Sequence, residues 1–363
     1  MKSIVVIGNS VAGLRVIEKL RENDPAWEAT VFTMGEKGPY DRSRFPMLIA
    51  QKATAEGAVS HPGDYFEKAK ITVSTEKLAR VNFKKNAVFT EEKRAQEYDV
   101  LVIAATENFR LPEIKGANKT NVVGGGKFKD LEQILAVAPL AETVVVQGQD
   151  LNSVKFAAAM HKRNPETIFI PTAKTLAPLD EESSQKICQR LQDVGVRVMG
   201  DTSIAEILGD TEAKAIRLKS GKVIGCQLIV LTEELPDLRL FKDSGIALQE
   251  RIVVDKSGCT NVANVYAAAE LAATITPSGW TNFDNCQDIL CSQGQLIAAQ
   301  ILGEQDILPV PSGELTLEID GISFSLISAG ADSGQFKLTM DEQSAGVCAE
   351  SISIKGPPDK PEA

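Results

Sequence analysis

Short apolar runs alternate with amphipathic stretches along most of the chain. Residues 4–7 and 98–105 are rich in Val, Ile, Leu and Ala, a composition typical of strands buried on both faces of a parallel sheet. After the first run, Leu14, Ile17 and Leu20 recur at helical spacing, with charged residues on the other face. This alternation of buried strands and amphipathic helices predicts an α/β protein built on parallel sheets.

The turn between the first strand and the first helix, residues 8–13, has the sequence Gly-Asn-Ser-Val-Ala-Gly. Gly8 allows a tight turn, and Gly13 lets the helix pack closely on the strand. The N-terminus of the helix then offers free N–H groups to a pyrophosphate. Ser10 replaces the middle glycine of G-x-G-x-x-G, and its side chain either crowds a phosphate or donates to it. The alternative is an ordinary strand–helix turn whose glycines serve packing alone.

Residues 28–33 read as the second parallel strand, and the loop after it has two features that bear on nucleotide binding. In a dinucleotide fold, an acidic residue near the end of this strand holds the ribose hydroxyls. The nearest acid is Glu36, which either has this role or is a solvated turn residue. Arg42 and Arg44 stand beside aromatic residues within residues 39–48. They either contact a phosphate or a flavin ring, or belong to an ordinary surface loop.

A second strand–turn–helix unit begins at residue 143. Its turn keeps Gly148 as the first glycine but loses the other two. Asp150 in this turn would direct a carboxylate at any pyrophosphate, which is repulsive. The following strand ends without an acid for a ribose, and Lys174 is the nearby cation for a 2′-phosphate. This unit therefore has a dinucleotide architecture with a poor dinucleotide fingerprint.

The rest of the chain continues the alternation. We expect helices over residues 181–194 and 288–302, and strands over residues 167–170, 197–199, 206–218, 223–232, 252–255, 264–272, 315–319, 322–327 and 335–340. Residues 71–80 and 81–90 are interpreted as an antiparallel pair of strands. Residues 124–127, Gly-Gly-Gly-Lys, lack the spacing of a P-loop and are interpreted as a flexible crossing between domains.

Length and charge narrow the classes of function. A chain of 363 residues exceeds one comfortable core, so two or three domains are expected. The net charge of −10 argues against nucleic acid or an anionic membrane surface as a partner. No apolar run reaches the roughly 18 residues of a membrane span. The N-terminus lacks a signal-peptide pattern, so the expected compartment is the cytoplasm.

Cysteine and histidine usage argues against metal and disulfide chemistry. The six cysteines are scattered and no C-x-x-C occurs, which predicts neither an iron–sulfur site nor a redox-active cysteine pair. His61 and His161, the two histidines, are too few for a His-rich metal site. We predict no metal site, and the sequence identifies no general acid or base.

Several of these segments, in order, resemble the FAD-dependent pyridine-nucleotide oxidoreductases, and most of all the rubredoxin reductases and the N-terminal part of nitrite reductases. The resemblance covers about residues 1–330. Besides the two strand–turn–helix units, residues 39–48 are similar to the family's P-Y-x-R-P-x-L, residues 98–106 to Y-D-x-L-x-I-A-T-G, and residues 264–272 to N-V-Y-A-A-G-D-V-A. Residues 319–322 resemble the strand that opens the family's small C-terminal domain.

The resemblance implies two Rossmann-like, three-layer nucleotide-binding domains and a small α/β C-terminal domain. An FAD-binding domain would be formed by residues 1–115 and 243–305, with a degenerate NAD(P)H-binding-type domain, residues 116–242, inserted between them. The small domain would take residues 306–345. Residues 346–363, rich in proline and charge, are expected to be a disordered tail.

On this resemblance, FAD lies along the first strand–turn–helix unit. Its expected contacts are Gly8, Asn9, Ser10, Ala12, Gly13, Thr33, Glu36, Arg42, Ala105, Thr106 and Glu270. In the family, a hydride passes from NAD(P)H to the flavin, which hands electrons to a small redox protein such as rubredoxin or ferredoxin. The implied function is an FAD-dependent oxidoreductase of this kind. An oligomer is possible on this resemblance, but the sequence does not specify the oligomeric state.

The sequence departs from the family pattern mainly on the nicotinamide side. Besides the lost glycines, Lys155 replaces an acidic residue and Glu233 stands at the place of a later glycine. On the flavin side, Thr106 replaces a glycine and Glu270 an aspartate. We therefore hypothesise that the chain keeps FAD while NAD(P)H binding is weak or lost. Two alternatives to an independent enzyme stay open: a flavin-containing or scaffold subunit of a larger redox complex, and a binding protein without either cofactor.

Overall fold

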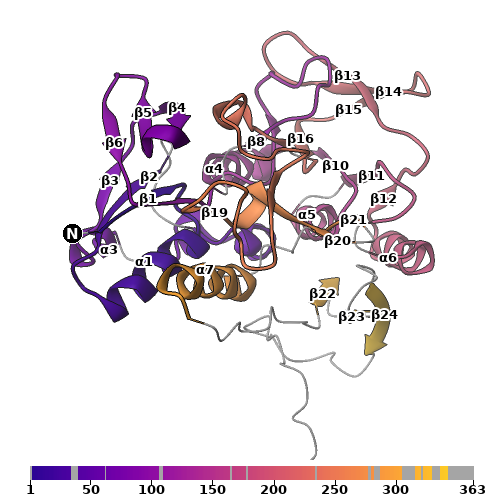
Figure 1. Cartoon of the computed structure of the whole chain (residues 1–363). Coiled ribbons are helices and arrows are strands. Elements are labelled where there is room, and N and C mark those ends of the chain that lie inside the picture. The colour runs from indigo at the N-terminus through magenta and orange to yellow at the C-terminus, as the bar shows by residue number, and fades with distance from the viewer. Residues whose placement is uncertain are drawn as a thin grey trace, which may run out of the picture. The chain divides into compact units, whose positions relative to one another are not determined.

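The computed structural model describes residues 2–33, 40–61, 63–105, 109–163, 166–176, 179–233, 235–276, 279–281, 287–304, 315–319, 322–328 and 336–341 (Figure 1). The chain forms two compact units. Unit 1 comprises Met1–Ser43, Ala58–Arg110 and Pro236–Val310, and unit 2 comprises Arg44–Gly57, Leu111–Leu235 and Pro311–Ala363. This division groups residues 44–57 and 311–363 with the middle of the chain.

Unit 1 is built on a five-stranded parallel sheet. Its order is β19 (Val265–Ala267), β7 (Val100–Ile103), β1 (Ser3–Ile7), β2 (Glu28–Phe32) and β3 (Thr72–Ser74). From β1 the chain adds β2 and then β3 on one side, and later β7 and β19 on the other. The topological switch point, where α/β sheets bind their ligands, therefore lies between β1 and β7.

Alternate side chains of β1 define the layers of unit 1, because successive residues of a strand point to opposite faces. Ile4 and Val6 pack with α1 (Val11–Asn23) and α7 (Gln287–Leu302), which lie side by side (Figure 1). Val5 and Ile7 pack with the antiparallel strands β4 (Leu78–Asn82) and β5 (Ala87–Thr90). Unit 1 thus has a helical layer, a parallel sheet and an antiparallel layer.

The smaller elements of unit 1 are β6 (Ala95–Glu97), β18 (Ile252–Val254), β20 (Ala272–Thr276), β21 (Gly279–Thr281), α3 (Tyr65–Lys68), η3 (Phe83–Lys85), η5 (Arg239–Phe241) and η6 (Ala269–Leu271). Short elements also lie where the chain passes between the units, namely η1 (Arg42–Arg44), η2 (Ala55–Ala58), β8 (Phe109–Arg110) and β17 (Leu235–Pro236).

Unit 2 repeats this plan on a second parallel sheet. Its order is β12 (Arg197–Val198), β11 (Glu166–Pro171), β10 (Thr143–Gly148), β16 (Leu228–Leu231) and β9 (Val122–Val123). One face packs with the antiparallel strands β13 (Ile204–Leu208), β14 (Ala215–Leu218) and β15 (Val223–Gly225). Helices α4 (Phe128–Val137), α5 (Leu151–His161) and α6 (Glu181–Asp193) contact the sheet strands. Further elements of unit 2 are α2 (Phe45–Ala50) and η4 (Ala138–Leu140).

The C-terminal strands agree closely with the sequence pattern. The strands β22 (Leu315–Ile319), β23 (Ile322–Ser328) and β24 (Phe336–Asp341) form an antiparallel sheet at the predicted positions. The predicted tail, residues 346–363, lies outside the described residues. The predicted α/β class with parallel sheets in two Rossmann-like units is confirmed.

Two predictions for connecting segments need correction. Residues 71–80 do not form one arm of a hairpin, because β3 pairs in parallel with β2 and only β4 pairs with β5. Residues 124–127 are not an open crossing between domains. Their three glycines are buried directly before α4, whose first turn is fixed when the Asp130 carboxylate accepts a hydrogen bond from the Lys127 N–H at 3.2 Å.

Candidate functional site

The parallel sheet of unit 1 gathers the predicted FAD contacts at one edge. Gly8 follows β1, Thr33 follows β2, and Ala105 lies two residues beyond β7. Glu270 stands three residues beyond β19. Because all these strands run in the same direction, their carboxyl ends meet at the edge that contains the switch point.

Gly8 and Gly13 are required by close packing at this edge. Gly8 has φ +99°, and a Cβ built on it would lie 2.3 Å from the Ala105 Cα. A Cβ on Gly13 would lie 2.6 Å from a Val6 methyl group. Gly13 therefore brings the start of α1 against β1, as the sequence predicted, and Gly8 brings the turn against the end of β7, which the sequence did not predict.

The N-terminus of α1 has an uncharged cap. The Ser10 hydroxyl accepts a hydrogen bond from the Gly13 N–H at 3.3 Å, and Asn9 and Ser10 are each only 2% exposed. Ala12 is fully buried, and its carbonyl oxygen would lie 2.5 Å from a Cβ on Gly294 of α7. The Ser10 hydroxyl thus acts as a helix cap, which leaves the positive end of the helix dipole without a negative charge from its own cap.

Glu270 forms a buried ion pair across this edge. Its Oε1 lies 3.0 Å from Nη1 of Arg42, and the two side chains are 4% and 15% exposed. Burial raises the pKa of Glu270, and the Arg42 charge opposes that shift. Ala269, where the resembling family has glycine, has φ +57°, and its N–H donates to Gln293 Oε1 of α7 at 2.9 Å. The backbone at this turn is therefore held in a conformation that favours glycine.

Five buried side-chain oxygen atoms of unit 1 have no hydrogen-bond partner among the described residues. Two of them, Thr33 Oγ1 and Glu270 Oε2, belong to residues that follow strands at this sheet edge. Buried polar groups without partners are uncommon in native folds and call for an explanation. The ribose and ribityl hydroxyls of FAD are donors of the kind that both atoms lack, so these residues fit the flavin nucleotide. Glu36 and Thr106 lie outside the described residues.

Arg251 is a residue of this site that sequence reasoning missed. It directly precedes β18, whose Ile252 pairs with Ala272 of β20, and Glu270 stands two residues before Ala272. The charge of Arg251 lowers the pKa of Glu270, against the larger effect of burial. No local sequence signal identifies it, because its place depends on pairing between strands that are distant from the first turn.

The turn of unit 2 has the same shape but a different charge. Asp150 caps α5: its Oδ1 accepts a hydrogen bond from the Ser153 N–H at 2.8 Å, and its own N–H donates to Ser153 Oγ at 3.2 Å. Ser153 is fully buried. The predicted carboxylate is thus present at the helix end, where it occupies the N–H group and the dipole that a pyrophosphate would use.

The neighbouring strand ends of unit 2 also carry polar side chains. A Cβ on Gly148 would lie 2.0 Å from Thr232 Oγ1 and 2.5 Å from the Ser153 Cβ. Glu233, directly after Thr232, accepts a hydrogen bond from the Thr172 hydroxyl, which follows β11. The edge of this sheet therefore holds two carboxylates, Asp150 and Glu233, near its switch point between β10 and β16.

A cavity of about 560 Å³ lies beside the ends of β11 and β12. Thr172, Lys174 and Lys219 are among the residues that line it. In a dinucleotide fold the adenosine ribose lies at the end of the second strand, so this cavity has the place of a nucleoside site. Lys174, the predicted cation for a 2′-phosphate, is part of its wall.

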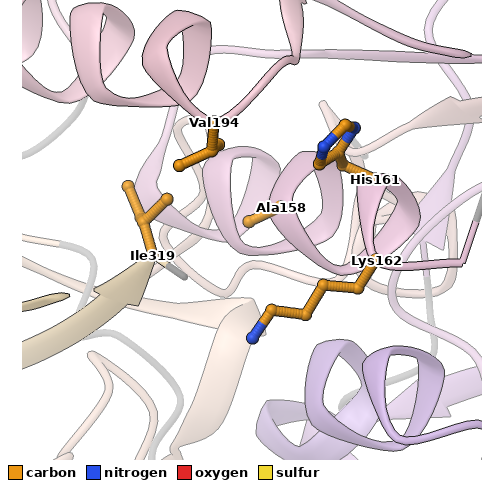
Figure 2. Close-up of a pocket in the computed structure, with 5 residues that line it drawn as sticks. All are labelled: Ala158, His161, Lys162, Val194 and Ile319. Atoms are coloured by element: carbon orange, nitrogen blue, oxygen red, sulfur yellow. The ribbon is translucent and has the colours of Figure 1, made fainter. Parts of the chain in front are cut away.

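A smaller hollow in unit 2 lies away from this edge. It measures about 230 Å³ and is lined by Ala158, His161, Lys162, Val194 and Ile319 (Figure 2). His161 and Lys162 stand at the C-terminal end of α5, the opposite end from the Asp150 cap. Figure 2 shows the Lys162 side chain extending away from α5. This hollow is therefore separate from the nucleotide edge.

The described cysteines are free thiols. They are Cys188, Cys226, Cys259 and Cys291, whereas Cys286 and Cys348 lie outside the described residues. Burial raises the pKa of Cys226 to about 12 and that of Cys259 to about 11. Both thiols are protonated at neutral pH, which is unfavourable for thiol–disulfide exchange. Within the described ranges, no group of three or more His, Cys, Asp and Glu side chains is arranged to hold a metal ion.

In the part of the chain that the structure describes, no helix is long and apolar enough to cross a membrane.

Two parallel sheets, each with a glycine-containing strand–turn–helix unit at its switch point, define the class of proteins with two dinucleotide-binding-type domains. Comparison with known families agrees, since the profile of the family described as pyridine nucleotide-disulphide oxidoreductase matches residues 2–288. The chain belongs to the pyridine nucleotide-disulphide oxidoreductase family. Membership implies a flavin and a pyridine nucleotide as the classes of cofactor.

Similar proteins carry oxidoreductase names. The chain is 25% identical over 274 residues to the assimilatory nitrate reductase electron transfer subunit of Bacillus subtilis (strain 168), covering 74% of this chain and 36% of that protein. It is 22% identical over 317 residues to rubredoxin-NAD(+) reductase of Ectopseudomonas oleovorans, covering 85% and 82%. A ferredoxin reductase from Rhodopseudomonas palustris has the same fold, with a TM-score of 0.79, 19% identity, and coverage of 90% and 82%.

These comparisons confirm the predicted family and the predicted fold class. The relatives are named as oxidoreductases, among them a rubredoxin-NAD(+) reductase. The chain spans about a third of the length of some curated relatives, such as the nitrate reductase subunit.

Proposed function

We propose that this chain is an FAD-dependent oxidoreductase that moves electrons between NAD(P)H and a small redox protein such as rubredoxin or ferredoxin. The observation that carries the proposal lies in unit 1. The Gly8 turn, Thr33 and the Glu270–Arg42 pair converge at one sheet edge, where two buried oxygen atoms lack donors. FAD offers hydroxyl donors and a pyrophosphate for the uncharged cap of α1.

The residues of the chain bind and orient the cofactor, and the flavin, when bound, supplies the hydride and single-electron chemistry. The proposed FAD contacts are Gly8, Asn9, Ser10, Ala12, Gly13, Thr33, Glu36, Arg42, Ala105, Thr106 and Glu270. Arg42 neutralises Glu270, and Glu270 Oε2 would be free to accept a hydrogen bond from a cofactor hydroxyl. The predicted domains, residues 1–115 with 243–305 for FAD and 116–242 for NAD(P)H, are part of this proposal.

Two relatives support the proposed partner, since one is named a rubredoxin-NAD(+) reductase and the other a ferredoxin reductase. For the nicotinamide nucleotide, the cavity beside β11 is the candidate nucleoside site. The Asp150 carboxylate at the cap of α5 predicts that this nucleotide binds weakly, because like charges repel at short range.

The proposal is tested with the full chain, purified and supplied with FAD. We expect stoichiometric FAD after desalting, bleaching of the flavin by NADH or NADPH without oxygen, and reoxidation by ferredoxin or rubredoxin. Failure to retain FAD would overturn the proposal. Retention of FAD without reoxidation by either acceptor would overturn the proposed partner class.

A second candidate function is favoured by the charged cap of α5. In it, the chain is a flavin-containing subunit of a larger redox complex and receives electrons from another subunit instead of NAD(P)H. The expected signature is a flavin that dithionite bleaches but that NADH and NADPH at millimolar concentration leave oxidised. Prompt bleaching by either nucleotide would exclude this candidate.

A further inference from the structure

Arg251 is a half-buried arginine of unit 1 whose charge is attracted by Glu270 and Glu250 but whose side chain makes no hydrogen bond with the described residues. It directly precedes β18, which pairs in parallel with β20. An arginine side chain carries five N–H donors in a rigid fork, so such a group is poised to bind an anionic oxygen.

The buried charge around Glu270 is not balanced. Glu270 contributes one buried carboxylate, and Arg42 already neutralises it through the 3.0 Å ion pair. Arg251 adds a second positive charge, and the other carboxylate that attracts it, Glu250, is exposed to solvent. Burial of a guanidinium without a hydrogen-bond acceptor is costly, and it lowers the pKa of Arg251. An anion at this position would compensate for the second buried positive charge.

Other unpartnered groups along the same sheet edge point to a nucleotide as the source of that anion. Glu270 Oε2 and Thr33 Oγ1 are buried acceptors without donors, and both follow strands of the same sheet edge. A ligand that satisfies all three residues must combine hydroxyl donors with an anionic oxygen. A flavin nucleotide has both, in its ribityl and ribose hydroxyls and in its phosphates or reduced ring.

We propose that Arg251 is a further cofactor-binding residue, which holds an anionic oxygen of the flavin nucleotide beside the Glu270–Arg42 pair. The inference rests on the proposed FAD function. The anionic oxygen has two sources: the phosphates, which are charged in both redox states, and the isoalloxazine ring, which gains negative charge on reduction. Contact with a phosphate strengthens binding of both redox states, whereas contact with the ring favours the reduced state.

The test compares Arg251→Gln, Arg251→Lys and wild type in the full chain, with Arg80→Gln as the control for loss of one exposed arginine of unit 1. FAD affinity is measured by fluorescence titration of the apoprotein, and the midpoint potential by dye equilibration. We expect Arg251→Gln to weaken FAD binding about tenfold or more, the magnitude of one lost charged hydrogen bond. Arg251→Lys keeps the charge and should recover part of that loss.

The potential separates the two sources. An unchanged potential with weaker binding assigns Arg251 to a phosphate. A potential lowered by about 30 mV, the equivalent of a tenfold preference in a two-electron couple, assigns it to the ring. If Arg251→Gln and Arg251→Lys match the Arg80→Gln control in both quantities, the inference is wrong. Should Arg251→Gln fail to fold, the same comparison is made with Arg251→Lys alone. Wild-type protein that binds no FAD would instead refute the proposed function.

Discussion

The two strand–turn–helix units share a backbone plan and differ in the charge at the start of the helix. In unit 1, the uncharged Ser10 hydroxyl caps α1, and Gly13 follows it in the first turn. In unit 2, the Asp150 carboxylate caps α5, and the buried Ser153 takes the place of that glycine. The same fold therefore presents a helix end suited to a phosphate in one unit and a helix end already supplied with an anion in the other.

This difference shows that a dinucleotide architecture and a dinucleotide site are separate properties. Both sheets place their first turn at a switch point, because the chain reverses its direction of strand addition there. A pyrophosphate beside Asp150 would experience a repulsion on the order of a few kcal/mol at a partly buried position. The second unit keeps the packing of the fold, and we propose that its Asp150 cap weakens nucleotide binding.

The largest expected losses of stability come from substitution of the first glycine in each turn, Gly8 in unit 1 and Gly148 in unit 2. Gly8→Ala should cost about 3 kcal/mol or more, because φ +99° is strained for alanine and the new Cβ would meet the backbone of Ala105. Gly148→Ala should cost less, since its nearest obstacles are the side chains of Thr232 and Ser153. Urea denaturation of both variants measures the difference. Equal losses would contradict the view that unit 1 has the more constrained turn.

Substitution of Arg42 should cause the next largest loss of stability. Arg42→Ala leaves Glu270 buried without its ion-pair partner, which costs about 3 kcal/mol at pH 8. Burial raises the pKa of Glu270 relative to the unfolded chain, and the Arg42 charge opposes that shift. A raised pKa means that the folded state binds the proton more tightly than the unfolded state, so this contribution to stability is complete below the unfolded pKa and is lost as the pH rises through the folded pKa. Without Arg42 the cost of ionising the buried Glu270 is larger.

The destabilisation by Arg42→Ala should therefore be smaller at pH 5 than at pH 8, measured by urea midpoints at both values. Arg80→Ala, at an exposed position, serves as the control and should be nearly neutral at both. A destabilisation by Arg42→Ala that grows as the pH falls would contradict the assigned ion pair.

Removal of the Asp150 charge tests the comparison between the helix caps directly. Asparagine also caps helices well, so Asp150→Asn should fold normally. We expect it to tighten NADH binding about tenfold, equivalent to about 1.4 kcal/mol. Asp193→Asn removes the same charge at the C-terminal end of α6 and should leave NADH affinity unchanged. Titration of flavin reduction against NADH concentration gives both values, and equal affinities in the two variants would refute electrostatic repulsion by the cap.

The smallest change in stability is expected from substitutions in the turn that contains Glu270. Ala269→Gly should stabilise the protein by about 0.5–1 kcal/mol, because it relieves a left-handed conformation at φ +57° at the cost of chain entropy. Ala268→Gly, at φ −143°, has no such strain to relieve and should destabilise by a similar amount. Thermal unfolding of the two variants should shift in opposite directions, and parallel shifts would show that Ala269 is unstrained.

Much of the fold was predictable because its signals are local. The apolar runs predicted β1, β7 and β10, and the alternating residues near the C-terminus predicted β22, β23 and β24. The prediction of a hairpin over residues 71–90 was only partly correct, because β3 pairs with β2, which is distant in sequence. Helix α4 was missed, since the three glycines before it suggested a flexible segment.

The candidate site was predictable to the extent that it depends on turn chemistry. Gly8, Gly13 and Asp150 have structural roles that their sequence context indicated. Arg251 was not predictable, because it comes near Glu270 only through the pairing of β18 with β20. The unpartnered oxygens of Thr33 and Glu270 likewise become visible only when the burial of each atom is known.

The most direct test of the central claim is the visible spectrum of the purified full chain without oxygen, before and after addition of NADH. The account predicts an oxidised-flavin spectrum that NADH bleaches in wild type only at concentrations about tenfold above those needed for Asp150→Asn. Protein that takes up no FAD on reconstitution would contradict the account, because unit 1 would then lack the cofactor that its edge fits.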